Sequence, residues 1–456
     1  MLCLRTLVSR AALVIGLALL PGPARAICSF DATDVALGTA TELCPQLVDI
    51  SKDCLGRAEP ECFEDPGALQ SFETWFVQIK SRPITERPLL VRIGPGTFAD
   101  SNSWFLACGD NVESPLEHGF TTIRGAGRSA TVLDLRPGME FLWARIGLVS
   151  WLCHEMHFSD MTVESEKYGV SVAGGGDTTW SRMDVEVGSP LTGGSVLNIG
   201  WQEESCGTRP DGSPFEHYLF DVRFRVRAKN QTNVGYHAPC DHNWFFSGEI
   251  DVTGDAIRNG STTDLIGVDV KGGGRFVGLD SRIRVETGDF TTGALGSAAG
   301  VTGVHVSGDE REFHMHGGLI SVDASGHPGA NATAIHAEGD THAHAFGTES
   351  RVTAGPPATG VAAGTPRRLF EQGGMIHSTQ FWGAAADPPR NADHYLLSLP
   401  GADLFVETDC NASGNCNASG SEAHLMIMNA ERCGDPADAT KDPWFDNVTR
   451  ACRTSP

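Results

Sequence analysis

The chain has 456 residues, a formal net charge of −23 at pH 7, 54 glycines and 20% charged residues. Such a negative molecule repels other polyanions, which excludes a nucleic acid held by charge and means that an acidic polysaccharide would need bridging cations or a local basic groove. The many glycines and the scarcity of long helical patterns indicate short strands joined by turns.

Residues 1–26 have the features of a secretory signal peptide. Arginines precede an apolar run from Ala11 to Leu20, and Ala24 and Ala26 supply small residues at a cleavage position. The apolar run is too short to cross a bilayer, and no later segment approaches about 18 uninterrupted apolar residues. We therefore expect an exported protein, extracellular, periplasmic or on an outer surface, without a membrane span.

The cysteines indicate an oxidising compartment. Of the 13 cysteines, all except Cys3 lie beyond the signal peptide. They form three groups of four: Cys28, Cys44, Cys54 and Cys62; Cys108, Cys153, Cys206 and Cys240; Cys410, Cys416, Cys433 and Cys452. An even number after export favours disulfides, with the pairing inside each group open. Zinc is the alternative, but CxxC pairs are absent from the sequence.

Residues 27–86 are expected to form a Cys-rich N-terminal segment that carries a helix. Between Gly67 and Ser81 the apolar residues recur at helical spacing and make one apolar face. Such a helix could cover the first coil of a repetitive sheet and hide its unpaired edge.

A two-part repeat occupies the chain from about residue 165. Its first part is a strand such as "GVDVKG" at 267 or "GVHVSG" at 303, and its second part is a strand such as "IRV" at 283 or "ISV" at 320. The two parts are 17 or 18 residues apart, whereas the distance between units varies by ten residues or more. A constant distance between the core strands of a unit, with connections of variable length between units, is typical of stacked coils. A β-sandwich is the alternative, but its tight hairpin turns are scarce here.

The predicted fold is therefore all-β, a single-stranded right-handed parallel β-helix of roughly ten coils. We expect the β-helix over residues 87–383, with a helical cap before it. Residues 384–456 carry the third group of cysteines and are expected to form a disulfide-rich C-terminal cap.

The opening of this region also resembles a known superfamily. A helical segment, then "VRIGPGTF" at 91, then "TTIRGAGRSATVLD" at 121 resembles the start of the pectin-lyase-like superfamily, in particular pectin methylesterases. The resemblance covers about residues 65–135 and implies the β-helix fold. Pectin methylesterases use two aspartates on neighbouring coils with an arginine; Asp184, Asp251 and Arg225 are of these types, but the family motifs around them are missing. Pectate lyases carry a "WIDH" segment near a calcium groove, of which "CDHNWFF" retains Asp241 and His242.

One outward column of side chains is expected along the second strand of the repeat. Alternate residues of a strand face opposite sides, so the middle residues of these segments should stack in one column: Asp184, Arg225, Asp251, Arg284, Ser321 and Arg351. The column is either a ladder of surface ion pairs or a groove in which carboxylates hold a cation or transfer protons. The candidate catalytic residues are therefore Asp184, Arg225, Asp251 and Arg284, and the candidate substrate-binding residues are Asp241, His242 and Asp269.

Two short histidine columns follow from the same alignment. His305 and His336 should stack in the first strand of the repeat, next to Asp269, and His314 and His344 should stack in the strand that connects the two parts. Stacked imidazoles about 4.8 Å apart could bind a transition metal, or they could stack on the surface without one. A transition metal or Ca²⁺ is the cofactor that these residue types allow.

Two functions remain open. The first is an exported β-helix protein that binds glycans or other surface partners through its exposed ladders and lacks an intact known catalytic motif. The second is a carbohydrate-active enzyme, a lyase, a hydrolase or a pectin-esterase-like enzyme, that acts on acidic polysaccharide. The sequence leaves the ligand and the oligomeric state open.

Overall fold

The computed structural model describes part of the chain between Leu47 and Arg453. The described ranges are 47–79, 90–100, 103–108, 121–136, 146–188, 197–205, 213–227, 232–254, 257–258, 261–262, 264–287, 300–307, 311–324, 331–338, 341–346, 348–353, 358–363, 368–372, 375–377, 393–397, 405–407, 424–427, 444–446 and 451–453. The signal peptide expected over residues 1–26 lies outside them.

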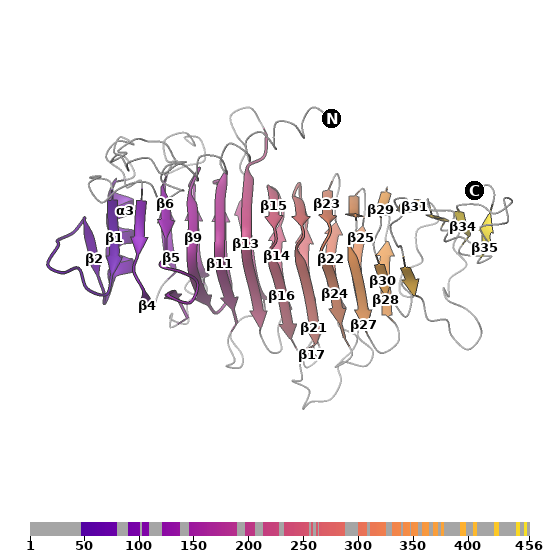
Figure 1. The fold of residues 1–456 in the computed structure, drawn as a ribbon, viewed down its shortest axis with the longest axis horizontal. Helices are drawn as coiled ribbons and strands as arrows, with labels where there is room; N and C mark the ends of the chain where they lie inside the picture. The colour runs from indigo at the N-terminus through magenta and orange to yellow at the C-terminus, as the bar shows by residue number, and fades with distance from the viewer. Residues whose placement is uncertain are drawn as a thin grey trace, which may run out of the picture.

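The strands stack into a parallel β-helix, which confirms the predicted fold class (Figure 1). One face is a nine-stranded sheet, made of β5 (Trp104–Ala107), β8 (Ile146–Trp151), β10 (Tyr168–Ala173), β12 (Leu197–Ser205), β14 (Thr232–Ala238), β19 (Leu265–Val270), β22 (Gly300–Ser307), β25 (Asn331–Glu338) and β28 (Ala358–Ala363). The first part of the sequence repeat lies on this face, because "GVDVKG" and "GVHVSG" fall on β19 and β22.

A 24-stranded sheet forms the rest of the wall and bends into two faces. The first face contains β1 (Leu47–Ser51), β2 (Cys62–Glu64), β3 (Leu90–Ile93), β6 (Thr122–Arg124), β15 (His242–Phe246), β20 (Arg275–Leu279), β23 (Arg311–His316), β26 (Thr341–Phe346), β29 (Arg368–Gln372), β31 (Asp393–Leu397) and β33 (His424–Ile427). The second face contains β4 (Gly96–Ala99), β7 (Thr131–Asp134), β16 (Glu249–Gly254), β21 (Arg282–Thr287), β24 (Leu319–Asp323), β27 (Glu349–Thr353), β30 (Met375–His377) and β32 (Phe405–Glu407). The long strands β9 (His157–Ser165), β11 (Thr178–Val187) and β13 (Glu216–Arg227) cover both faces.

Residues in the left-handed backbone region mark the bend between these two faces. Asp160, Arg182 and Asp221 have φ angles of 60°, 50° and 52° in the middle of β9, β11 and β13. Ser247 and Asp280 have φ angles of 51° and 49° in the short connections of the following coils. The same corner therefore recurs from coil to coil, which keeps the strands on both sides of it in register.

Three short antiparallel pairs among the described strands depart from the parallel stacking. The hairpin β17 (Ile257–Arg258) and β18 (Ser261–Thr262) follows β16. At the C-terminal end, β34 (Trp444–Asp446) pairs with β33, and β35 (Ala451–Arg453) pairs with β34.

The interior is built from columns of apolar side chains that continue through the coils. On the nine-stranded sheet, Val268 is in register with Val304, and Val304 is in register with Ile335. On the facing wall, Val285 is in register with Val322. Apolar side chains thus lie over one another as the repeat spacing predicted.

The glycine that opens the first part of the repeat allows these walls to approach closely. A Cβ atom on Gly267 would lie 2.4 Å from the carbonyl oxygen of Gly303 and 2.4 Å from Cγ2 of Ile283. Gly235, one coil earlier, would meet Ile250 Cγ2 at 2.2 Å. A side chain larger than hydrogen has no space here, which explains the "GV" that begins the repeat.

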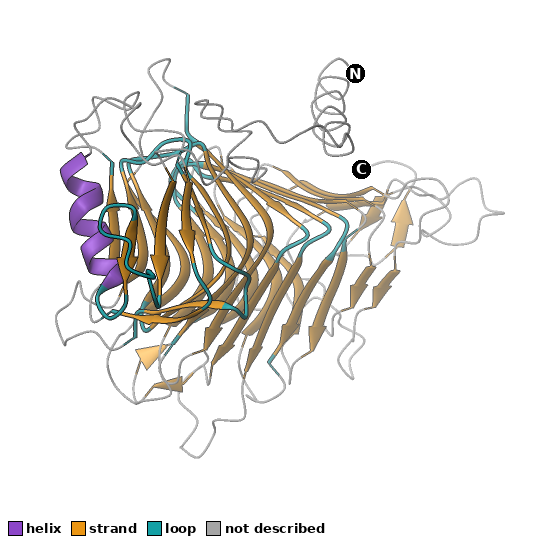
Figure 2. Cartoon of the chain, turned by 60° about the vertical axis from the view of Figure 1, so that its left-hand side comes forward, coloured by secondary structure: helices purple, strands orange, loops and turns teal. Residues whose placement is uncertain are grey.

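The helix predicted between residues 67 and 81 is α3 (Ala68–Ile79). It lies at the N-terminal end of the stack (Figure 2). Phe72 is buried, with ring contacts to Phe63 of β2 and Trp104 of β5. The strands β1 and β2 already belong to the parallel sheet, so stacking begins before the helix.

Disulfides join cysteines within the predicted groups. Cys54 pairs with Cys62, and Cys108 pairs with Cys153. In the described part of the chain, no helix is long and apolar enough to cross a membrane.

Candidate functional site

The predicted outward column is present with one correction. Arg225 is in register with Asp251, and Asp251 is in register with Arg284. Asp184, however, is in register with Arg223, and Glu186 occupies the position opposite Arg225. β11 contains the segment "MDVEV", in which both "MDV" and "VEV" have the apolar, polar, apolar pattern of the repeat. In the structure, "VEV" and not "MDV" is in register with "FRV" of the next coil.

The charged side chains of this column form ion pairs along the surface. Arg225 Nη1 lies 2.8 Å from Glu186 Oε1 and 3.9 Å from Asp184 Oδ2. Asp251 Oδ2 lies 3.6 Å from the guanidinium of Arg227, which is 61% exposed. Exposed pairs of this kind contribute about 0–1 kcal/mol each to stability. The arrangement matches the ion-pair ladder, one of the two interpretations of the column.

Arg284 continues this ladder. Its Nε lies 3.3 Å from Glu286 Oε2 on the same strand, and its side chain is 61% exposed. Ser321 and Arg351 follow in register on β24 and β27. The pairs thus run along the strands as well as between coils, which keeps like charges apart.

A second polar column lies on the outer side of the nine-stranded sheet. Gln202, His237, Asp269, His305 and His336 are in register on five successive coils. His305 Nδ1 lies 2.9 Å from one Asp269 carboxylate oxygen, and His237 Nε2 lies 3.7 Å from the other. The rings of His305 and His336 have centroids 5.3 Å apart, so the first histidine column stacks as predicted.

Asp269 is the acidic residue of this column, and its carboxylate group contacts several neighbouring side chains. Lys271 Nζ lies 2.8 Å from its Oδ2. Burial opposes the ionisation of Asp269, but the hydrogen bonds from His305 and Lys271 and the charge of Lys271 outweigh burial and hold the pKa of Asp269 below its ordinary value. Asp269 thus has side-chain partners directly after its own strand and on the next coil.

The second histidine column is also in register, with His314 opposite His344 and His316 opposite Phe346. His314 Nε2 lies 3.3 Å from Glu312 Oε2. Burial and the charge of Arg275 lower the pKa of His314 against the opposing effect of Glu312. The side chain of His344 lies outside the described residues, so metal binding at either histidine column stays a prediction.

Asp241 and His242 are adjacent in sequence but differ in exposure. Asp241 is 2% exposed and faces the interior. His242 begins β15 in a half-buried position, where burial and the charge of Arg275 lower its pKa. Because Asp241 is enclosed, it does not line the outer face together with His242.

The sequence interpretation missed an outward patch of four aromatic side chains on β13 and β15. Tyr218 stacks with Trp244, with ring planes 10° apart and centroids 6.5 Å apart. Phe220 stacks with Phe246, with planes 9° apart and centroids 4.7 Å apart, and Phe220 is 41% exposed. We call these four residues the aromatic platform. Its signal in the sequence is aromatic residues at alternate positions in both "EHYLF" and "HNWFF".

A column of polar side chains borders the platform at the start of the strands. Glu216, His242, Arg275 and Glu312 are in register on successive coils. The Tyr218 hydroxyl donates a hydrogen bond to Glu216. Arg275 has its guanidinium carbon 5.8 Å from the centre of the Trp244 ring, and its Nε lies 2.9 Å from Glu312 Oε2. Flat apolar rings are thus placed beside hydrogen-bonding groups on one face.

No family model matches the chain, and no curated protein matches it by sequence. Two solved structures are similar, the A-modules of the mannuronan C-5 epimerases AlgE6 and AlgE4 from Azotobacter vinelandii. The AlgE6 module covers 75% of this chain and 92% of its own length, with a TM-score of 0.36 and 11% identity. The AlgE4 module covers 79% and 96%, with a TM-score of 0.34 and 11% identity. Similarity at this level carries no information on activity.

Proposed function

We propose that this protein is an exported, non-catalytic glycan-binding protein whose aromatic platform receives the sugar rings of a neutral polysaccharide. The observation that carries the proposal is the pair of stacked rings at Phe220 and Phe246 on the outer face, beside the parallel pair Tyr218 and Trp244. Contiguous apolar area on the outside of a protein usually marks a binding site.

A sugar ring suits this platform better than a purely apolar ligand. A pyranose ring presents C–H groups on its faces and hydroxyl groups around its rim. The C–H groups are attracted to the negative faces of aromatic rings. The rim hydroxyls would meet the bordering polar column, where Glu216 and Glu312 offer acceptors and Arg275 offers donors.

The charge distribution favours a neutral glycan over a polyuronate. The chain carries a net charge of −23. Next to the platform, the positive charge of Arg275 is paired with Glu312, and Glu216 adds a further acid. A polyanion would therefore be repelled over long range and would find little compensating charge on contact.

Binding without turnover is supported by the way the candidate catalytic residues are paired. Arg225 is held by Glu186 and Asp184, and Asp251 is close to Arg227. A general acid or base must reach the reacting bond, and an arginine must be available for the developing charge. These groups are instead engaged with one another. The alternative, an enzyme that acts on acidic polysaccharide, requires this network to open.

A polysaccharide panel tests the proposal. The purified mature protein is run in affinity gels that contain neutral β-glucans, mannans or xylans, or pectate or alginate, with and without Ca²⁺. In parallel, the reaction mixtures are analysed for reducing ends, unsaturated ends and released methanol. We expect retardation by at least one neutral polysaccharide and no product. Turnover of a uronate that is lost in Arg225→Ala and Asp251→Ala would contradict the proposal and support the enzyme.

A further inference from the structure

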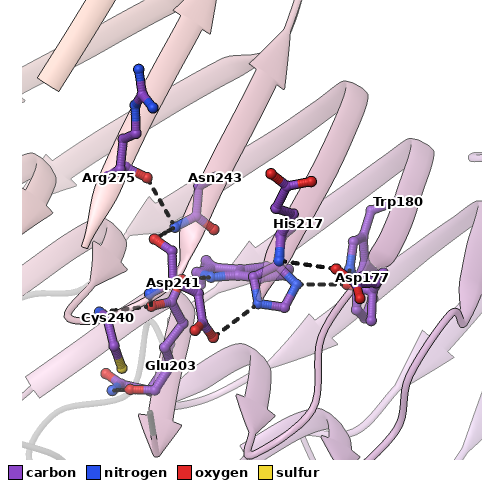
Figure 3. A network of polar contacts seen from close by, with 12 residues as sticks. Asp177, Trp180, Glu203, His217, Cys240, Asp241, Asn243 and Arg275 are labelled. Carbon is purple, nitrogen blue, oxygen red and sulfur yellow. Dashed lines mark hydrogen bonds and ion pairs between the residues drawn. The ribbon is translucent and has the colours of Figure 1, made fainter. Parts of the chain in front are cut away.

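The interior of the β-helix contains three ionisable side chains that lie close together, Glu203, His217 and Asp241 (Figure 3). Glu203 lies on β12, His217 on β13, and Asp241 in the turn that precedes β15. One ligand atom of each residue lies within 4.8 Å of those of the other two. The exposed fractions are 1%, 0% and 2%, so the cluster is closed to solvent. It is separate from the aromatic platform and independent of the proposed function.

The cluster occupies interior columns that are polar beside His217, where Thr178 and Asn243 are in register on either side, and that become apolar further along. Glu203 is in register with Val172 on β10. The column of His217 continues through Asn243 to Phe276. Carboxyl groups buried among such residues are costly unless an opposite charge or hydrogen bonds compensate them. Glu203 and Asp241 therefore each need hydrogen bonds or a positive charge close by.

The imidazole of His217 is already oriented towards the carboxylates. Its Nδ1 lies 2.8 Å from Thr178 Oγ1, and Trp180 Nε1 donates to the same hydroxyl at 2.7 Å. This contact fixes the ring so that Nε2 faces Asp241 Oδ2, 3.3 Å away. Histidines that bind metals are typically held in this way by a hydrogen bond at the second ring nitrogen.

The two carboxyl groups differ in how far hydrogen bonds satisfy their oxygens. Trp201 Nε1 donates to Glu203 Oε1 at 3.5 Å. Glu203 Oε2 accepts hydrogen bonds from the backbone N–H groups of Cys240 and Asp241, at 3.2 Å and 3.1 Å. Asp241 Oδ1 is buried and has no hydrogen-bond partner among the described residues. Asp241 therefore has a buried carboxylate oxygen that is available to a ligand.

We propose that Glu203, His217 and Asp241 bind a divalent first-row transition ion, Zn²⁺ or Mn²⁺, inside the β-helix. One imidazole nitrogen and two carboxylate oxygens are donors that such ions accept. Donor atoms that share a tetrahedral ion at about 2.0–2.2 Å lie about 3.4 Å apart, so these atoms, which lie within 4.8 Å of one another, would draw together on binding. The ion would join β12, β13 and the turn before β15. Since the cluster is enclosed, its role is structural.

The metal content of the full chain tests this site. Protein without a histidine tag is purified from medium supplemented with Zn²⁺ or Mn²⁺ and analysed by inductively coupled plasma mass spectrometry. We expect about one ion per chain in the wild type and in the surface control Glu186→Gln, and about a tenth of that or less in Glu203→Gln and Asp241→Asn. X-ray absorption should show nitrogen and oxygen ligands and no sulfur.

The wild type alone also decides the question, in case either variant fails to fold. Wild-type protein that contains no Zn²⁺ or Mn²⁺ after growth in either medium would overturn the proposal. Retention of the full metal content by a folded Glu203→Gln variant, or sulfur ligands in the absorption spectrum, would place the ion elsewhere and would also overturn it.

Discussion

Phe246 stacks on Phe220 of the preceding coil, with ring centroids 4.7 Å apart and ring planes 9° apart. The two residues are in register in a parallel sheet, so the backbone itself places one ring over the other. Tyr218 and Trp244 repeat the relationship two positions earlier on the same strands. The parallel β-helix thus converts two short aromatic segments into one flat surface.

The first prediction separates the outer rings from the core of the same strand pair. Phe220→Ala should lower the free energy of unfolding by about 1 kcal/mol or less, because the ring is 41% exposed. Phe245→Ala, a truncation of a fully buried ring on β15, should lower it by about 3–5 kcal/mol. Urea unfolding followed by far-UV circular dichroism measures both. Equal losses would mean that Phe220 belongs to the core and is not held for a ligand.

The second prediction concerns the ion-pair ladder. Arg225→Gln removes the contacts with Glu186 and Asp184, and we expect a loss of about 1 kcal/mol or less, since the pairs are partly exposed and screened. The difference from the wild type should shrink further in 1 M salt, where the Debye length is about 3 Å. A loss of several kcal/mol that salt does not change would show that the arginine is structurally essential.

The third prediction concerns the close approach of the walls at Gly267. Gly267→Ala should destabilise the protein by about 1–3 kcal/mol or prevent folding, because the added carbon would lie 2.4 Å from Gly303 O. Gly94→Ala is the control, since its nearest neighbour would be at 3.5 Å. Melting temperatures of the two variants give the comparison. A Gly267→Ala variant as stable as the control would contradict the packing described for the interior.

The fourth prediction follows from the pKa of Asp269, which lies below its ordinary value in the folded protein. Ionised Asp269 therefore stabilises the fold at pH values above the unfolded pKa of about 3.9, and this contribution is lost as the pH falls through the lower folded value. The stability difference between wild type and Asp269→Asn should be constant above about pH 5 and shrink below about pH 4. A difference that stays constant down to pH 3 would show that the carboxylate gains nothing from His305 and Lys271.

Much of the fold could be predicted because the repeat is visible in the sequence. Constant spacing placed Val268 over Val304 and His305 over His336, and the register confirms both. The predicted alignment was wrong at Asp184, because "MDVEV" can be aligned with the repeat in two ways that differ by two residues. Both alignments leave the same side chains facing outward, so hydrophobic alternation cannot distinguish them.

The sites were harder to predict than the fold. The aromatic platform depends on Phe220 and Phe246 facing outward, which becomes clear once Leu219 and Phe245 are known to be buried. The buried cluster was harder to predict than the aromatic platform, because Glu203 lies in "WQEES", a polar segment that indicates exposure to solvent. Its inward direction follows from the register of Val172 with Glu203, and β10 and β12 have a register shift directly after that position.

The most direct test of the central claim is the affinity of the best neutral polysaccharide fragment for Trp244→Ala, measured by isothermal titration calorimetry. Trp151→Ala is the matched control, because Trp151 is 36% exposed but lies on β8 of the nine-stranded sheet. We predict that Trp244→Ala weakens binding about tenfold or more, as expected when a large apolar contact is removed, while Trp151→Ala binds like the wild type. Unchanged affinity in a folded Trp244→Ala variant would contradict the account.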